Sequence, residues 1–247
     1  ARVINMSFGD VVYSRVLRDV IRYAYARGVV MVASAGNAQS TALHYPSAYD
    51  GTISVSATVS NDRPAGFSNY GPTIDIAAPG SDILTTHPGG GYTGFFGTSA
   101  SAPFVSGVAA LLLSRSDALT PEDVRGLLIS SAEDLGARGW DDRFGAGLLR
   151  ADNALRLEYP STVRILSPRT DAGTNAQEVG VVGTVASPLM TGYRVMYGVG
   201  VNPQRWTDIT ADIPRQVIAD TLCRWDVSEL ADTTYTLRLA ALTDKGI

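Results

Sequence analysis

A long uncharged stretch is the feature that most constrains how this chain can fold. From Ile83 to Ser114 the sequence contains no Asp, Glu, Lys or Arg, and after Ser99 it is rich in Ala, Val, Gly and Leu. This composition predicts a helix that is buried on all sides. Pro103 fits the first turn of such a helix, because its missing N–H removes no internal hydrogen bond there. Ser99 is therefore expected at the helix N-terminus.

That position favours negative charge beside the Ser99 oxygen. Free backbone N–H groups and the positive end of the helix dipole meet there. Beside a nucleophilic hydroxyl at this place, the free backbone N–H groups would form part of an oxyanion site. The alternative is that Ser99 only caps a core helix, since Ser and Thr are common N-caps.

Four motifs in a fixed order favour the functional interpretation. Gly97 to Pro103 (GTSASAP) resembles the nucleophile motif Gly-Thr-Ser-Met-Ala-x-Pro of the subtilisin-like serine peptidases, or subtilases. The other stretches that resemble this family are 3–9 (VINMSFG), 30–37 (VMVASAGN), and 67–71 (FSNYG) followed by 78–80 (APG). Ordered matches over about the first 155 residues are more specific than one short motif.

The resemblance implies roles for particular residues. Ser99 corresponds to the nucleophile that forms an acyl-enzyme, and Asn37 to the asparagine whose amide donates to the oxyanion. Segments at the ends of two strands would line the cleft and pair with an extended substrate peptide. The expected substrate-binding residues are Ser7, Phe8, Gly9, Ser34, Ala35, Gly36 and Thr98. The walls of the first pocket, near Phe8 and residues 33–36, predict an apolar slot.

The histidine and aspartate that this chemistry needs are not found in their expected patterns. The family requires an Asp, a His and then the Ser, in that order along the chain. The two histidines are His44 and His87, and neither lies in a His-Gly-Thr-His motif. Both are expected as partly exposed loop residues, with substrate contact by His87 as a minor alternative. We expect the missing Asp and His upstream of Ala1, which would make this chain a fragment that is inactive alone.

Residues 1–159 are predicted to form an N-terminally incomplete α/β domain with a subtilisin-like parallel sheet. A strand at 3–7, a helix from about Val11 to Arg27 and an apolar strand at 29–34 imply a right-handed crossover. Without its first strands, this domain is expected to expose an unpaired strand edge or apolar surface. The stripe expected to face the core from the first helix consists of Val12, Tyr13, Val16, Leu17, Val20 and Ile21.

Later segments of this domain contain local sequence signals for further strands and a helix. Strands are expected at 52–57, 74–77 and 83–85. Thr120 followed by Pro121 is typical of a helix start, with a weak capping box at Asp123. Val124, Leu127 and Leu128 are expected to form the buried face of that helix.

In residues 160–247 the apolar side chains recur with a period of two, which predicts a small antiparallel β-sandwich. It resembles, weakly, an immunoglobulin-like or fibronectin-type accessory domain. Trp206 and Trp225 are expected as core anchors, and a turn at 244–246 suggests a domain truncated at Ile247. Strands are expected near 162–167, 178–186, 192–199, 216–226 and 234–242.

Composition excludes several classes of function. The net charge is −4 and no basic run is present, so a nucleic-acid partner is not expected. The uncharged helix is too short and too interrupted for a membrane span. The single cysteine, Cys223, excludes an internal disulfide framework and a multi-cysteine metal site.

The expected partners are a protein or peptide substrate and the upstream segment with the Asp and the His. From the family and the accessory domain, a secreted or cell-envelope location is expected. The chemistry requires no cofactor and no catalytic metal. Structural calcium is not located, because Asp75 corresponds to a position near a weak cation site of the family but Thr73 stands where a second acid is expected.

Two other functions are alternatives to a serine endopeptidase. A pseudopeptidase or peptide-binding module would keep the cleft without catalysis, although such a protein has no chemical need for both Ser99 and Asn37. An esterase of the α/β-hydrolase type requires Gly-x-Ser-x-Gly and a later histidine. Here Ser101 stands in place of the second glycine and no histidine follows, so this function is set aside.

Overall fold

The computed structural model describes all residues except 158–161, 170–171, 188–189, 202, 204 and 244–247. The chain divides into two units, Ala1–Pro160 and Ser161–Ile247, and each is described by itself. The boundary predicted near Pro160 and the turn predicted at 244–246 lie outside the described residues.

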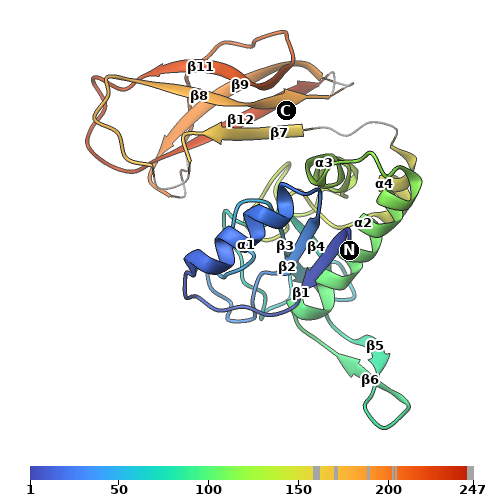
Figure 1. Cartoon of the computed structure of the whole chain (residues 1–247). Coiled ribbons are helices and arrows are strands. Elements are labelled where there is room, and N and C mark those ends of the chain that lie inside the picture. Colours follow the sequence, from blue (N-terminus) through green and yellow to red (C-terminus); the bar gives the residue numbers. More distant parts are fainter. Residues whose placement is uncertain (158–161, 170–171, 188–189, 202, 204, 244–247) are drawn as a thin grey trace. The chain divides into compact units, whose positions relative to one another are not determined.

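A four-stranded parallel sheet forms the centre of the first unit (Figure 1). Its strands pair in the order β1 (Val3–Met6), β2 (Val30–Ser34), β3 (Thr52–Thr58) and β4 (Ile76–Pro79). All three strand pairs are parallel, in agreement with the predicted crossover. The two central strands are buried along their whole length, as expected when helices cover both faces of a sheet.

Successive side chains of β2 face two different cores, because side chains alternate along a strand. Val30 and Val32 pack against the helices α2 (Thr98–Arg115) and α3 (Pro121–Ser131). The residues that alternate with them pack against α1 (Arg15–Tyr25) on the opposite face. The sheet therefore holds α1 and the Ser99 helix on opposite sides.

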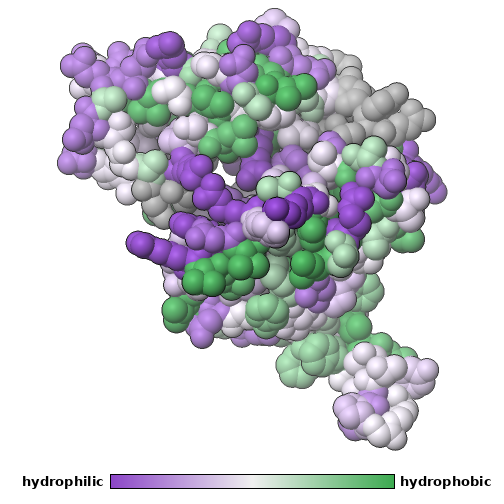
Figure 2. All heavy atoms as spheres, in the orientation of Figure 1, coloured by the Kyte–Doolittle hydropathy of each residue, from purple (hydrophilic) through white to green (hydrophobic). Residues whose placement is uncertain are grey.

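Helix α1 starts later, and is more exposed, than the sequence predicts. The side chain of Ser14 caps its first turn, so the helix does not begin near Val11. Ile21 is buried, but Val16 is 75% exposed and Val20 is 57% exposed. The prediction that these valines face the core is wrong, because only the Ile21 side of α1 packs on the sheet. Hydrophobic residues are visible on this part of the surface in Figure 2.

Helix α2 is buried on one side only, so the prediction of complete burial is also wrong. Val105, Ala109 and Leu112 lie in the core. On the opposite side, Phe104 is 42% exposed and Leu111 is 49% exposed. Each of these two side chains leaves nearly half of its surface exposed, although the helix sequence is apolar all round.

Strand β1 lies at the edge of the sheet, where the sequence predicts an unpaired strand edge. Among the described residues only β2 pairs with it, and Ile4 is 39% exposed. The strands β5 (Ile83–Thr86) and β6 (Tyr92–Phe95) form an antiparallel hairpin that projects from the first unit in Figure 1. The first unit therefore leaves both a strand edge and a hairpin without cover in the described part of the chain.

Helix α3 agrees with its local sequence signals. Thr120 Oγ1 accepts a hydrogen bond from the Asp123 N–H at 3.1 Å, and the Asp123 carboxylate accepts one from the Thr120 N–H at 2.9 Å. This is a complete capping box. The predicted buried residues, which are Val124, Leu127 and Leu128, are all fully buried. The short helix α4 (Ala151–Arg156) packs against α3.

The second unit consists of two three-stranded antiparallel sheets that share one hydrophobic core. Tyr193 is fully buried, and its hydroxyl donates to the Leu222 carbonyl of the other sheet at 2.9 Å. Trp225 lies in this core, whereas Trp206 is half-buried and stacks against the Arg238 guanidinium. One sheet has the order β11 (Val217–Asp226), β8 (Glu178–Ala186), β7 (Thr162–Ser167), and the other β10 (Thr207–Asp208), β9 (Met190–Val199), β12 (Tyr235–Thr243).

The predicted strand positions of this unit agree closely with the structure, and among its described residues only the two-residue strand β10 lies outside the predictions. None of the helices in the described part of the chain has the length and apolar character that a membrane span needs.

Candidate active site

Two predicted cleft segments leave the sheet side by side. Strands β1 and β2 are paired and parallel, so residues 7–9 and 35–37 follow them at the same edge. In open α/β sheets this is the edge where ligands bind. The N-terminus of α2 reaches the same place, because the Gly36 N–H donates to Thr98 Oγ1 at 3.1 Å.

Asn37 is anchored to the first turn of α2 by its side-chain oxygen. Asn37 Oδ1 accepts a hydrogen bond from the Thr98 N–H at 2.9 Å and another from the Thr98 hydroxyl at 3.0 Å. Thr98 itself is fully buried. With the oxygen held in this way, the Asn37 amide nitrogen lies beside Gly97. A Cβ atom built on Gly97 would be 3.2 Å from this nitrogen. The amide donor is thereby fixed next to the turn that begins the helix.

Ser99 is the second residue of α2 and is held against the end of β1. Its Oγ donates to the Ser7 carbonyl at 3.3 Å, and the Ser7 Oγ donates to the Ser99 carbonyl at 2.8 Å. The Asn5 amide in turn donates to the Ser7 Oγ at 2.8 Å. Among the described residues, no imidazole or carboxylate forms a hydrogen bond with the Ser99 hydroxyl. The serine is therefore positioned but not activated by a base.

The predicted substrate-binding residues differ in what they can offer a ligand. Phe8 is 59% exposed and presents its ring to solvent. Ser34 and Ala35 are buried, so their side chains do not line a cleft. Gly9 lies three residues after β1 and Gly36 two residues after β2, and pairing of this backbone with a substrate peptide stays a prediction.

Neither histidine lies where a general base would be expected. His87 is exposed in the turn of the β5–β6 hairpin, where its N–H bonds to the Gly91 carbonyl. His44 is partly exposed, as predicted, but its Nδ1 atom is buried without a hydrogen-bond partner. Its ring lies against Gly9 and Gly36. The slot predicted to be apolar therefore has an imidazole against both of its backbone walls, which is a correction to the sequence-based expectation.

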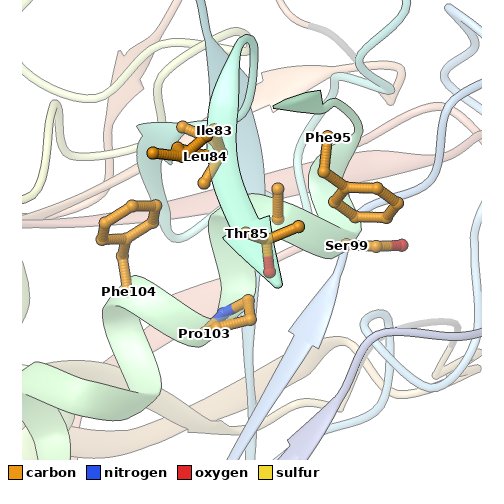
Figure 3. A pocket seen from close by; sticks show the side chains of 8 residues that line it. Ile83, Leu84, Thr85, Phe95, Ser99, Pro103 and Phe104 are labelled. Carbon is orange, nitrogen blue, oxygen red and sulfur yellow. The ribbon is translucent and has the colours of Figure 1, made fainter. Parts of the chain in front are cut away.

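A pocket of about 380 Å³ adjoins Ser99. Figure 3 shows the rings of Phe95 and Phe104 on opposite sides of it, with Thr85 and Pro103 between them. No motif in the sequence indicates this pocket, although every residue that lines it falls within the uncharged stretch from Ile83 to Ser114. The lining residues are Ile83, Leu84, Thr85, Phe95, Ser99, Ala100, Pro103 and Phe104.

The Asp75 carboxylate is engaged by a guanidinium and does not form a cation site. It pairs with Arg125 and accepts a hydrogen bond from the Ser54 N–H at 2.8 Å. Burial lowers the pKa of Arg125, but the charges of Asp75 and Glu122 outweigh burial and raise it. A metal ion would have to displace this fixed positive charge. In the described parts of the chain, no group of three or more His, Cys, Asp or Glu side chains is arranged to hold a metal.

The fold and site define a subtilisin-like α/β unit, in which a serine at the start of the central apolar helix lies beside an anchored asparagine. A family model described as the subtilase family matches residues 1–147, and the chain belongs to this family.

Individual relatives agree with this assignment. The chain is similar to subtilisin DY of Bacillus licheniformis, with 40% identity over 156 residues that cover 62% of this chain and 56% of that protein. It is also similar to thermitase of Thermoactinomyces vulgaris, with 40% identity over 139 residues that cover 56% of this chain and 49% of that protein. The chain thus spans about half the length of the curated relatives that it matches.

Solved structures show the same fold. A mutant of the protease domain of PatA is 37% identical, with a TM-score of 0.57, over 63% of this chain and 58% of that one. A lanthipeptide protease is 29% identical, with a TM-score of 0.58, over 62% of this chain and 60% of that one.

Proposed function

We propose that this chain carries the nucleophile and the oxyanion donors of a subtilisin-like serine endopeptidase. The observation that carries the proposal is the anchoring of Asn37 to the residue before Ser99. Thr98 holds the Asn37 oxygen through two hydrogen bonds, so the orientation of the amide group is fixed before a substrate binds. Preorganised donors of this kind are the main source of transition-state stabilisation in acyl transfer.

In the proposed reaction, Ser99 Oγ attacks the scissile carbonyl carbon of a protein or peptide. The serine proton passes to a histidine, and the carbonyl oxygen becomes an oxyanion that accepts from the Asn37 amide and the Ser99 N–H. The C–N bond then breaks, the leaving amine takes the proton, and the acyl group stays on Ser99 until water releases it. The reaction needs no cofactor.

The general base and its aspartate are proposed to come from sequence upstream of Ala1. Two features support this proposal: the unpaired edge of β1, and the apolar pocket beside Ser99. A segment that paired with β1 would lie next to the end of the sheet where Ser99 is held. This chain alone is therefore proposed to hydrolyse peptides poorly or not at all.

The second unit is proposed to be an accessory β-sandwich of the immunoglobulin or fibronectin type. The support is its pair of antiparallel sheets around one core, which Tyr193 and Trp225 fill. Together with the family, an accessory unit of this kind supports a secreted or cell-envelope location for the protein.

A peptide-binding module without catalysis is the second candidate. One observation favours it: Ser99 Oγ donates to the Ser7 carbonyl, which leaves the hydroxyl without a base among the described residues. Against it stands the anchored Asn37, which a purely binding protein does not need.

A fluorophosphonate probe, which labels activated serines, distinguishes the two candidates. It would be applied to this chain alone and to the chain extended upstream, each beside a Ser99→Ala variant. We expect labelling of the extended chain only, and none in the variant. A correctly folded extended chain that is not labelled would favour the binding module.

A further inference from the structure

Asn69 is a buried side chain that binds the loop carrying Asn37. It is only 5% exposed. Its Oδ1 atom accepts hydrogen bonds from the Ala38 N–H at 2.9 Å and from the Ser40 N–H at 3.2 Å. Its Nδ2 atom donates to the Ala35 carbonyl at 2.9 Å. These three bonds reach the chain on both sides of Asn37, and none of the three involves Asn37 itself.

The backbone next to Asn69 holds the same loop. The Asn69 N–H donates to the Gly36 carbonyl at 2.9 Å, and the Gln39 N–H donates to the Phe67 carbonyl at 3.0 Å. Gly36 has a φ of 103°, and a side chain at this position would collide with the Asn69 amide. The residue directly before Asn37 is therefore confined both by its own backbone turn and by the side chain of Asn69.

The partners of Asn69 match an amide group and no other side chain of this size. Two N–H donors meet its oxygen, and one carbonyl meets its nitrogen. The reverse orientation would place the NH₂ group against two donors and the oxygen against a carbonyl. An aspartate lacks the donor, and a leucine lacks both the donor and the acceptor. The identity of this residue therefore fixes the shape of the loop around Asn37.

We propose that Asn69 is a positioning residue for the oxyanion donor, because it holds the backbone of the Asn37 loop while Thr98 holds the Asn37 side chain. This inference rests on the proposed function, since it concerns the reaction proposed for Ser99. Asn69 acts through Asn37 and not on the reacting atoms. Misplacement of a reacting group by about 1 Å can cost about a hundredfold in rate. A small shift of this loop would therefore weaken catalysis even with Thr98 in place.

A purely structural role for Asn69 gives a different expectation. Loss of its hydrogen bonds would then lower the stability of the first unit, but the molecules that remain folded would react at the normal rate. A positioning role instead lowers kcat, and it does so only while Asn37 is present. The dependence on Asn37 separates the two roles.

The test is steady-state kinetics of the chain extended upstream, with Asn69→Ala introduced alone and together with Asn37→Ala. We expect Asn69→Ala alone to lower kcat by at least about tenfold, with KM nearly unchanged. In the Asn37→Ala background, the same substitution should change kcat by less than about twofold, because residues that act as a unit are not additive. An unchanged kcat in Asn69→Ala, or an equal loss with and without Asn37, would overturn the proposal.

Ser56→Ala is the matched control. Ser56 is fully buried, and its hydroxyl donates to the Arg143 carbonyl at 2.7 Å, so this variant also loses a hydrogen bond inside the first unit. It should be less stable but should keep the kcat of the unmodified protein. A loss of kcat as large as that of Asn69→Ala would show that destabilisation alone lowers the rate, and would overturn the positioning role.

A second variant covers the case in which Asn69→Ala does not fold. Asn69→Asp keeps the size of the side chain and the oxygen that accepts from Ala38, but it removes the donor to the Ala35 carbonyl. The same pair of measurements, with and without Asn37→Ala, is then made on this variant. The results that support or overturn the proposal are the same.

A further measurement does not depend on catalysis. NMR relaxation of the Asn37 side-chain amide reports its motion on the picosecond to nanosecond timescale. We expect a rigid amide in the unmodified chain and in Ser56→Ala, and a more mobile one in Asn69→Ala. If Asn37→Ala left kcat unchanged, the proposed function of Asn37 would fail, and this measurement would still show whether Asn69 holds it. An equally rigid amide in Asn69→Ala would contradict the role of Asn69 itself.

Discussion

Thr98 donates two hydrogen bonds to the side-chain oxygen of Asn37, one from its backbone N–H at 2.9 Å and one from its hydroxyl at 3.0 Å. The same hydroxyl oxygen accepts from the Gly36 N–H at 3.1 Å. One buried threonine thus joins the end of β2, the asparagine and the start of the serine helix. The orientation of the Asn37 amide depends on this residue.

Asn37→Ala should lower kcat of the extended, active protein while leaving KM nearly unchanged, because the amide acts mainly on the transition state. In subtilisin itself, loss of the oxyanion asparagine costs about 10² to 10³ in kcat, and we expect a loss of the same order here. Steady-state kinetics on one peptide substrate would measure it. A change in KM alone would contradict the proposed role.

Thr98→Val should produce a smaller loss of kcat than Asn37→Ala, because the backbone N–H still holds the Asn37 oxygen. The variant keeps the shape of the side chain but removes the hydroxyl that bridges Asn37 and Gly36. We expect a loss of about tenfold, as for one neutral hydrogen bond. Thr98→Ser retains the hydroxyl and should restore most of the rate. If Thr98→Val and Thr98→Ser had equal rates, the hydroxyl would have no positioning role.

Local signals in the sequence predicted local structure well. Helix α3 was placed correctly because its cap at Thr120 and its buried leucines lie within a few turns of one another. The strands β7 and β8 were predicted at 162–167 and 178–186, since alternation over a few residues is enough to identify a strand. The grouping of Ser99 with Asn37 came from the family resemblance and not from spacing alone.

Features that depend on distant neighbours could not be predicted in the same way. An apolar residue such as Val16 looks identical in sequence whether or not another segment covers it, and here it is exposed. Likewise, nothing in the residues around His44 shows that its ring reaches Gly9 and Gly36, because that contact depends on how three loops meet at one sheet edge. The exposure of Val16 and the position of the His44 ring both depend on packing between segments that are distant in the sequence.

The partly buried ion pair of Asp75 and Arg125 should contribute to the stability of the first unit. Arg125→Met leaves the carboxylate, which is 12% exposed, without its counter-charge. Removal of one partner costs about 3–5 kcal/mol in a fully buried pair, so we expect a smaller loss for this pair, whose guanidinium is 28% exposed and partly screened by solvent. Hydrogen exchange of the β2 and β3 amides in increasing urea would measure the loss in this unit alone.

The double variant Asp75→Asn with Arg125→Met is the matched control for that measurement. Residues in contact do not act additively, so the double variant should be less destabilised than the sum of the single variants. Additive effects would show that the two side chains do not stabilise each other.

The exposed face of α1 provides a test of the upstream segment. Val16→Ser with Val20→Ser should change the stability of this chain alone by less than about 0.5 kcal/mol, as for other surface substitutions. Ile21→Ala, on the buried side of the same helix, should cost about 2–5 kcal/mol. In the extended chain the valine variant should become clearly destabilising, if upstream residues cover this face. If the valine substitutions had equally small effects on the stability of the chain alone and of the extended chain, upstream residues would not cover this face of α1.

The Cys223 thiol should react slowly in the folded protein. Burial raises its pKa from the ordinary value of 9.0 to about 11, and only the thiolate is nucleophilic. At pH 8 the folded chain should therefore contain about a hundredfold less thiolate than the unfolded chain, and alkylation by iodoacetamide should slow to a similar extent. Because burial favours the neutral thiol, its stabilising contribution is complete below about pH 9 and is lost as the pH rises toward about 11. Comparison of the pH dependence of stability with that of Cys223→Ala, between about pH 9 and 11, isolates the contribution of the thiol. If the folded and unfolded chains were alkylated at equal rates, the thiol would not be shielded.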